Sequence, residues 1–222
     1  MTRLLMLVEG QSEEIFVKQT LAPHLANHGV FVQPIVLWTK RLAAGGGHRG
    51  GVSNWHQIQR SLLPLTSDTD AWITTLLDFY GLPDDVPGYQ EALLPGNPRE
   101  RVAGLEACLA AKVNNQRFIP FLALHEFEAW VFCNANVLAK HFDRADLVGK
   151  VTDAIAVAGE PELINHGKDT HPKARLQAMA TGYKETSNGP TLMGKIGITA
   201  IRDACPHFAT WLSRLEALGS EA

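Results

Sequence analysis

The segment LLMLVEGQSEEIF, from Leu4 to Phe16, changes from a strand pattern to a helix pattern within a single turn. Residues Arg3 to Val8 are almost entirely apolar, which predicts a parallel strand buried on both faces. Ser12 is a predicted N-cap, with Glu13 and Glu14 in the first turn of a helix. Many α/β proteins hold phosphate at such a turn, at the N-terminus of the helix. This chain instead places Glu9 where the strand stops.

Further strands and helices alternate outward from this segment. Glycine, proline and polar clusters separate them and mark the turns. We predict strands at Val30–Leu37, Ala71–Leu77 and Arg117–Leu124, and helices at Ser12–Asn27, Ser53–Leu63 and Pro98–Val113. Pro34 places the second strand near an edge of the sheet. The alternation predicts an α/β fold with a mainly parallel, four-stranded sheet and right-handed crossovers.

The chain after about Val131 shows no convincing strand pattern. Four segments are instead helical in character: ANVLAKHF, RADLVGKVTDAIAVAG, HPKARLQAMA and FATWLSRLEAL. We therefore predict an α/β core at residues 1–133 and a helical extension, residues 134–222, packed on it. Between these helices, GYKETSNGPTLMG (Gly182–Gly194) is the best candidate for a second functional loop.

Composition excludes several classes of protein. The 222 residues carry 20 basic and 23 acidic side chains, a net charge of -3, so bulk charge would not attract nucleic acid. The three cysteines are odd in number and form no CxxC, which argues against a zinc knuckle or a disulfide framework. We find no signal-peptide pattern and no apolar run long enough to span a membrane. We therefore expect a cytoplasmic protein that does not associate with membranes.

Acidic residues follow three of the predicted strands. The first strand ends at Glu9, the third at Asp78, and the fourth at His125, with Glu126 and Glu128 behind it. Ligands of open parallel sheets bind at the carboxyl ends of the strands. If these strands are neighbours, about 4.8 Å apart, their carboxylates repel unless a cation joins them. Mg²⁺ or Mn²⁺ suits such oxygen ligands, and it could activate a water and stabilise the leaving oxygen of a phosphodiester.

Each of these residues also has a structural interpretation. Glu13 and Glu14 suit the helix dipole, and Asp78 suits a cap of the turn before Gly81. Glu9 could form a buried salt bridge to a basic residue, Lys40 or Arg41. His125 could be a general base, a phosphate contact, a neighbour of the metal ligands or a structural histidine.

The spacing of Glu126 and Glu128 limits what a regular helix could do with them. If a helix begins at Glu126, then Glu128 points away from the face that Glu126 shares with Trp130. At most one of the two glutamates would then reach a common metal without irregular backbone.

Two basic segments could contact phosphate. The glycine-rich stretch TKRLAAGGGHRGG contains Lys40, Arg41, His48 and Arg49, and its glycines would let main-chain amides approach an anion. The second segment, NHGKDTHPKAR, is the densest basic cluster, and Tyr183 and Lys184 could extend its surface. Its basic residues are His166, Lys168, His171, Lys173 and Arg175. The alternatives are a surface loop and a solvated helix start after Pro172.

Two motifs resemble a known fold. LVEGQSEE, together with a strand ending in LLDFYG, is similar to the Toprim fold of topoisomerases, primases and nucleases of the overcoming-lysogenization-defect type. More closely, the chain resembles a bacterial Toprim-like family catalogued as domain of unknown function 4276. The segments that carry this resemblance span nearly the whole chain: VEGQSEEIFV, DFYGLP, RFIPFLALHEFEAWVF, PELIN, THPKARL, GYK and CPHFATWL.

The resemblance implies metal-dependent phosphodiester chemistry, with Glu9, Glu13 and Asp78 as metal ligands. Some relatives of this type act in anti-phage defence, often alongside an ATPase. The chain departs from the Toprim Asp-x-Asp motif because Tyr80 stands at the second acid, which Asp84, Asp85 or the acids of HEFE would have to replace. It also has Ala174 where a lysine is expected, with Lys173 one place earlier.

Two hypotheses follow. The first is a metal-dependent nuclease or related phosphoryl-transfer enzyme acting on DNA or RNA. Here Glu9, Asp78, His125 and Lys173 are the catalytic candidates, and Glu126 or Glu128 completes the metal site. The second, favoured by Tyr80, is a catalytically silent module whose helical extension docks a partner such as an ATPase. The sequence leaves the oligomeric state open and is compatible with a homodimer.

Overall fold

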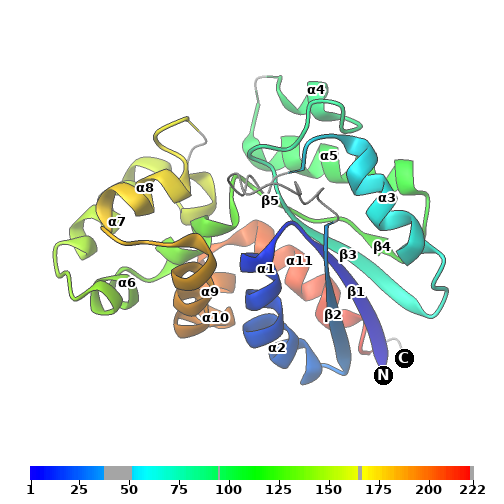
Figure 1. Ribbon diagram of the computed structural model, residues 1–222, viewed down its shortest axis with the longest axis horizontal. Helices are drawn as coiled ribbons and strands as arrows, with labels where there is room; N and C mark the ends of the chain where they lie inside the picture. The colour runs from blue at the N-terminus through cyan, green and yellow to red at the C-terminus, as the bar shows by residue number, and fades with distance from the viewer. Residues whose placement is uncertain (38–51, 95, 165–166, 221–222) are drawn as a thin grey trace, which may run out of the picture.

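A parallel β-sheet forms the centre of the protein. In the computed structural model, its strands lie in the order β2-β1-β3-β4, with β5 also paired to β3, and every pairing is parallel (Figure 1). This arrangement confirms the predicted α/β class. The strands are β1 (Thr2–Val8), β2 (Val30–Val36), β3 (Ala71–Asp78), β4 (Phe118–Ile119) and β5 (Leu122–Ala123). The structure describes residues 1–37, 52–94, 96–164 and 167–220.

Strand β1 is buried on both faces, as its apolar sequence predicted. Leu4, Met6 and Val8 belong to one hydrophobic core, and Leu5 and Leu7 belong to another on the opposite face. Side chains alternate between the faces of a strand, so a run of apolar residues supplies both cores at once. Strand β2 lies at the edge of the sheet, where the missing N–H of its proline is tolerated, and this prediction is also confirmed.

The predicted fourth strand is interrupted. It forms two short strands, β4 and β5, separated by Pro120 and Phe121. Proline has no N–H to donate to a ladder. Threonines of β3 supply side-chain hydrogen bonds at this point. Thr74 Oγ1 donates to the Ile119 carbonyl at 2.6 Å, and Thr75 Oγ1 lies 2.8 Å from both the N–H and the carbonyl oxygen of Phe121. The prediction of one continuous strand was therefore wrong, although its place beside β3 was right.

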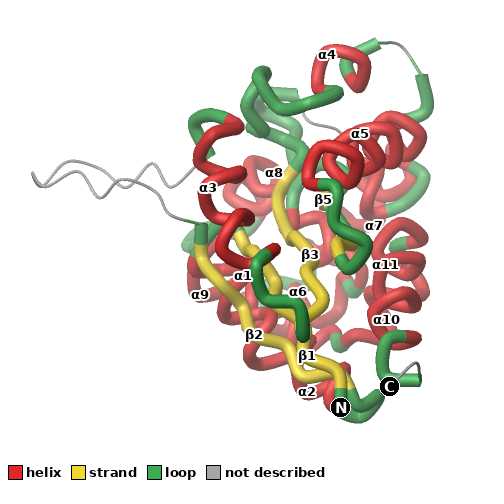
Figure 2. Tube along the Cα trace, turned by 90° about the vertical axis from the view of Figure 1, so that its right-hand side faces the viewer, coloured by secondary structure: helices red, strands yellow, loops and turns green. Residues whose placement is uncertain are grey.

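Helices cover both faces of the sheet (Figures 1 and 2). The first helical stretch includes a π-helical turn, η1, just before Pro23, and its N-cap is Gly10 rather than the predicted Ser12. The helices that precede β4 in the chain are α1 (Gln11–Phe16), η1 (Val17–Leu21), α2 (Ala22–Ala26), α3 (Trp55–Thr66), α4 (Tyr89–Ala92) and α5 (Pro98–Val113).

The chain after β5 is helical, as predicted. The segment Gly182–Gly194, expected as a loop, is largely helix α9, which accommodates Pro190 inside it. The helices here are η2 (Phe127–Cys133), α6 (Ala135–Phe142), α7 (Leu147–Ala158), η3 (Pro161–Leu163), α8 (Pro172–Met179), α9 (Glu185–Ile196), α10 (Ile198–Ala204) and α11 (Pro206–Ala217). No helix in the described ranges is both long and apolar enough to cross a membrane.

Helix α11 packs directly on the sheet. The Trp211 ring stacks on Phe121 with centroids 4.2 Å apart, and its Nε1 donates to Thr74 Oγ1 at 2.9 Å. The C-terminal helices thus share one hydrophobic core with β1 and α1. The start of β1 and the residues just after α11 lie close together (Figures 1 and 2), and Thr2 Oγ1 contacts the Leu218 carbonyl. The predicted division at residue 133 stays a prediction, but the two parts share this core.

Candidate metal centre

The carboxyl ends of β1, β3 and β5 meet at one edge of the sheet and bring several acidic residues together. Glu9 directly follows β1, Asp78 is the last residue of β3, and Glu126 and Glu128 come shortly after β5. The adjacency of β1, β3 and the fourth-strand segments, on which the predicted cluster depended, is confirmed.

Asp78, Glu126 and Glu128 form the centre of this cluster. One carboxylate oxygen from each lies within 4.8 Å of the others. Glu126 and Glu128 are almost fully buried, whereas Asp78 is partly exposed. A common ligand of the three carboxylates would therefore be reached from the side of Asp78.

Both glutamates reach the cluster because the backbone around them is not α-helical. Glu126 is extended, with φ -144° and ψ 149°, and a 3₁₀ helix follows it from Phe127 to Cys133. A 3₁₀ helix has about three residues per turn, so α-helical spacing does not apply. We expected that a regular helix would let only one of the two glutamates reach a common metal. Because the backbone here is irregular, that restriction does not apply.

Main-chain hydrogen bonds hold the segments after β3 and β5 side by side. The N–H of Phe79 donates to the Ala123 carbonyl at 3.0 Å, and the N–H of Tyr80 donates to the His125 carbonyl at 2.7 Å. The Phe127 N–H then donates to Asp78 Oδ1 at 2.8 Å. The two segments therefore continue their pairing beyond the strands, which fixes Asp78 against the start of η2.

The start of α8 holds Glu126 from the other side. Glu126 Oε2 lies 2.8 Å from Nδ1 of His171 and accepts the Lys173 N–H at 2.9 Å. A carboxylate is favourably placed at a helix N-terminus. The Tyr80 ring stacks on His171, with centroids 4.7 Å apart. Tyr80, which stands where the Toprim motif has its second acid, therefore helps to hold His171 against Glu126.

Glu9 and Glu13 border the cluster on the β1 side. The Asp78 N–H points to Glu9 Oε2 at 3.5 Å, a long hydrogen bond. Glu13 Oε2 accepts the Gly10 N–H at 2.9 Å and so caps α1. Glu14 instead pairs with Lys18 at 2.6 Å on the surface. Glu13 therefore caps the start of α1 and also lies beside the acidic cluster.

Burial and mutual repulsion raise the pKa values of these acids. Burial and the nearby Glu13 raise the pKa of Glu9 to about 7. Burial, together with Glu9, Glu128 and the other acids, raises the pKa of Asp78 well above its ordinary value. Burial followed by the charge of Glu126 does the same to the pKa of Glu128, and burial raises the pKa of Glu13. The carboxylates thus cannot all be charged unless a cation compensates them.

One oxygen of the cluster lacks a partner. Glu128 Oε1 is buried and accepts no hydrogen bond from any residue in the described part of the chain. Such an atom costs about 1–3 kcal/mol when nothing compensates it. Carboxylate oxygens are the ligands preferred by hard divalent cations such as Mg²⁺ and Mn²⁺. The donor set and its unpaired oxygen therefore fit a divalent cation.

Lys173 brings a positive charge close to the acidic cluster. Its Nζ lies 3.0 Å from Glu185 Oε2. Burial opposes its charge, but the carboxylates of Glu128 and Glu185 raise the pKa of Lys173 above its ordinary value. Lys173 is thus a protonated side chain beside the acids, in the segment where a lysine was expected one place later. Glu185 was not predicted, because it lies in the segment Gly182–Gly194, which the sequence analysis treated as a loop.

The remaining predicted residues lie in varied surroundings. His125 is buried. Arg175 is half-buried, and its Nε donates to the Thr170 carbonyl at 2.6 Å. The side chains of Lys168, Lys184, Asp84 and Asp85 are exposed. Asp85 accepts the Trp55 N–H at 2.7 Å, so this contact occupies one of its oxygens. Lys40, Arg41, His48, Arg49 and His166 lie outside the described residues.

Three solved structures of one protein match this chain at low sequence identity. Three structures of the C-terminal region of the Xanthomonas campestris pv. campestris OLD protein, phased with iodine, mercury and platinum, match with TM-scores of 0.33, 0.36 and 0.35. Their identities to this chain are 13%, 14% and 15%. The matches cover 96% of this chain and 97%, 97% and 95% of the others.

Sequence comparison identifies a family. No functionally curated protein matches the chain significantly. The model of the family described as "Domain of unknown function (DUF4276)" matches residues 8–216. This range contains Glu9, Asp78, Glu126, Glu128 and Lys173. Because the match spans nearly the whole sequence, the chain belongs to the DUF4276 family.

Proposed function

We propose that this protein is a Toprim-like, Mg²⁺- or Mn²⁺-dependent nuclease or related phosphoryl-transfer enzyme. The observation that carries the proposal is the meeting of Asp78, Glu126 and Glu128 within 4.8 Å, with one buried Glu128 oxygen left without a partner among the described residues. Three carboxylates at this distance need protons or a cation, and an acidic oxygen-only site selects a hard cation.

The protein's own residues divide into ligands and supports. Asp78, Glu126 and Glu128 would hold the cation, with Glu9 and Glu13 beside them. His171 and the Lys173 N–H orient Glu126, and the Phe127 N–H orients Asp78. These supports occupy one oxygen of each of the two carboxylates and leave the second available. The carboxylates of Asp78 and Glu126 are therefore held in position before a cation binds.

The cation and Lys173 would act on the same phosphate group. When bound, the divalent cation supplies Lewis-acid stabilisation of negative charge and makes a water more acidic. Lys173 would pair with a phosphate oxygen, since its ammonium lies among the acids and stays charged. Exposed Lys168 and Lys184 would contact the backbone of DNA or RNA further from the reaction.

The test is cleavage of a panel of DNA and RNA substrates by the purified full-length chain with Mn²⁺ or Mg²⁺. We expect Asp78→Asn and Glu128→Gln to abolish cleavage. Asp78→Asn keeps an oxygen that can accept the Phe127 N–H, so folding should survive. Glu14→Gln is the matched control, because Glu14 pairs with Lys18 at the surface. Equal cleavage by Asp78→Asn and the unmodified chain would contradict the proposed site.

Metal binding separates this proposal from the silent module. Tyr80 at the second acid favours a module that docks a partner such as an ATPase, but the two glutamates after β5 supply acids at the same edge. Calorimetry of the wild-type chain with Mn²⁺ decides between the two. No Mn²⁺ binding, with no cleavage alone or with a partner ATPase, would overturn the enzyme and favour the silent module.

A further inference from the structure

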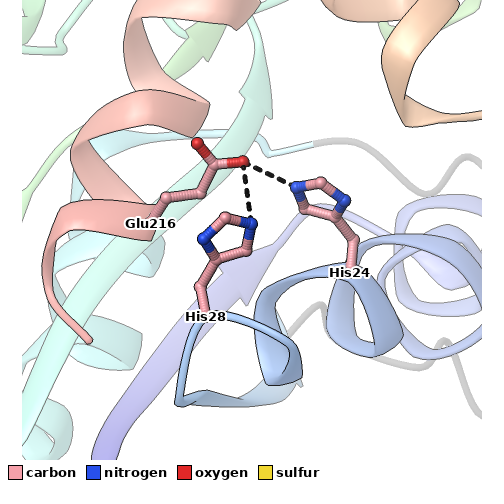
Figure 3. A group of neighbouring side chains, drawn as sticks. All are labelled: His24, His28 and Glu216. Atoms are coloured by element: carbon pink, nitrogen blue, oxygen red, sulfur yellow. Dashed lines mark hydrogen bonds and ion pairs between the residues drawn. The ribbon is translucent and has the colours of Figure 1, made fainter. Parts of the chain in front are cut away.

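A second group of metal-ligand side chains lies far from the acidic cluster. It consists of His24 in α2, His28 in the turn after α2, and Glu216 in α11. Figure 3 shows both imidazole rings directed at the same oxygen of Glu216. His24 Nε2 lies 2.6 Å and His28 Nε2 lies 3.6 Å from Glu216 Oε1. One ligand atom from each of the three residues lies within 4.8 Å of the others.

The local structure places the two histidines on one side of α2. They are four residues apart, and side chains at that spacing share a helix face. The His28 N–H donates to the Leu25 carbonyl at 2.9 Å, three residues back, so a tight turn follows α2. Gly29, at φ +77°, then turns the chain into β2. The two rings therefore face the same neighbour, which is the end of α11.

Glycine allows the end of α11 to approach the histidines closely. A Cβ atom at Gly219 would lie 1.6 Å from the His28 carbonyl oxygen, so a larger residue would push α11 away. Thr2 Oγ1 also donates to the Leu218 carbonyl at 2.9 Å. Three segments distant in sequence are thus fixed around the group, which makes it a built site.

Arg202 positions the carboxylate. Its guanidinium pairs with Glu216 Oε2 and leaves Oε1 facing the imidazoles. Glu216 is therefore a carboxylate that is already oriented toward the two imidazoles.

The ligand chemistry suits zinc. Zinc binds imidazole nitrogen and carboxylate oxygen at about 2.0–2.2 Å, and two histidines with one glutamate form a known three-ligand set. In a tetrahedral site of that size, ligand atoms lie about 3.3 Å apart. The two measured separations from Glu216 Oε1, 2.6 and 3.6 Å, lie on either side of this value. Because the His28 side chain is 41% exposed, solvent can fill the remaining position.

We propose that His24, His28 and Glu216 bind Zn²⁺, with water completing the coordination, and that the ion ties α11 to α2. This site is independent of the acidic cluster. It lies beside the N-terminal end of β1, whereas the acids lie at the opposite end of that strand. Seven strand residues separate the two ends by about 20 Å. The oxygen-only cluster suits a hard cation, and the imidazoles favour zinc.

The experiment titrates Zn²⁺ into the full-length chain, stripped of metal and kept in excess Mg²⁺ to occupy the acidic cluster. Calorimetry and competition with a coloured chelator measure the affinity. We expect a single zinc equivalent, with affinity at least about tenfold weaker in His28→Ala and Glu216→Gln. His56→Ala and Glu128→Gln are the controls, since His56 is an exposed residue of α3 and Glu128 belongs to the other site. Both controls should bind zinc as the unmodified chain does.

Co²⁺ gives a second measurement. Its visible absorption should appear in the unmodified chain and vanish in His28→Ala, while circular dichroism confirms that the variant is folded. Three results would overturn the proposal: no zinc binding by the unmodified chain, equal affinity in His28→Ala, or loss of binding in either control. The first two results would mean that the three residues form only an ion-paired contact. None of these results bears on Mn²⁺-dependent cleavage.

Discussion

The main-chain N–H of Phe127 donates a 2.8 Å hydrogen bond to Oδ1 of Asp78. This contact joins the last residue of β3 to the first residue of η2, 49 positions later in the chain. It explains why Glu126 and Glu128, on either side of Phe127, stand next to Asp78. The predictions below concern this cluster and the core that supports it.

The charge of Glu9 should make the metal-free protein less stable as the pH rises. The folded-state pKa of about 7 lies above the ordinary glutamate value of 4.5, so the folded state binds the proton more tightly. The contribution of Glu9 to the free energy of unfolding is therefore greatest below pH 4.5 and falls as the pH rises from 4.5 to about 7. One pKa unit is worth about 1.4 kcal/mol, so a loss of about 2–3 kcal/mol is expected from Glu9. Urea denaturation between these pH values measures it.

Glu9→Gln should remove much of this pH dependence, because glutamine cannot ionise. Glu14→Gln should leave it unchanged, since Glu14 pairs with Lys18 on the surface. A pH dependence that is identical in Glu9→Gln and the unmodified chain would show that Glu9 is not the titrating group.

His171 should strengthen metal binding through Glu126. Its Nδ1 lies 2.8 Å from Glu126 Oε2, so His171→Ala frees the carboxylate to move. Supports of this kind are typically worth about 10–100-fold in metal affinity. Calorimetry with Mn²⁺ should show a loss in this range, and His56→Ala, in α3, should show none. Unchanged affinity in His171→Ala would mean that the Lys173 N–H suffices to position Glu126.

Lys173 should affect catalysis without supporting metal binding. Lys173→Ala removes a positive charge from beside the acids, so the affinity for Mn²⁺ should stay the same or rise. Cleavage should fall by about 10²–10³-fold if the ammonium stabilises the phosphate in the transition state. Lys150→Ala, at an exposed position of α7 where it pairs with Asp146, is the control. Parallel loss of metal binding and cleavage would point to a structural role for Lys173.

Trp211 should be required for the stability of the whole chain. It is buried, stacks on Phe121 and donates to Thr74 Oγ1, so it joins α11 to the sheet. Removal of a large buried aromatic side chain costs about 3–5 kcal/mol. Trp211→Ala should lose that much in urea denaturation, and Val157→Ala, whose side chain lies at the surface, should lose little. A near-neutral Trp211→Ala would argue that the helical extension contributes little to the core.

Local pattern was enough to predict most elements of the fold. The apolar run of β1, Pro34 at the edge strand and the bounds of α5 all follow from short-range chemistry: burial on both faces, a missing N–H and helix capping. The failures also have local causes. Pro120 divides the fourth strand. Helix α9 contains both a glycine and a proline, and these residues led to the prediction of a loop.

The candidate site was predicted only in part. Parallel strands put their carboxyl ends at one edge, so Glu9, Asp78 and the acids after the fourth strand could be grouped on the condition that their strands are neighbours. Glu185 could not be included, because its place beside Lys173 depends on how α9 packs. The histidine pair His24 and His28 has a recognisable four-residue spacing, but the sequence does not show that Glu216 faces it.

By itself, the sequence determined the class of the fold and the strands that acids follow, because these depend on residue type and local pattern. The tertiary structure decided which acids meet. Extended and 3₁₀ backbone after β5 turns Glu126 and Glu128 toward Asp78, and α8 returns from far along the chain to hold Glu126. Contacts between segments so distant in sequence arise from packing, which no local pattern encodes.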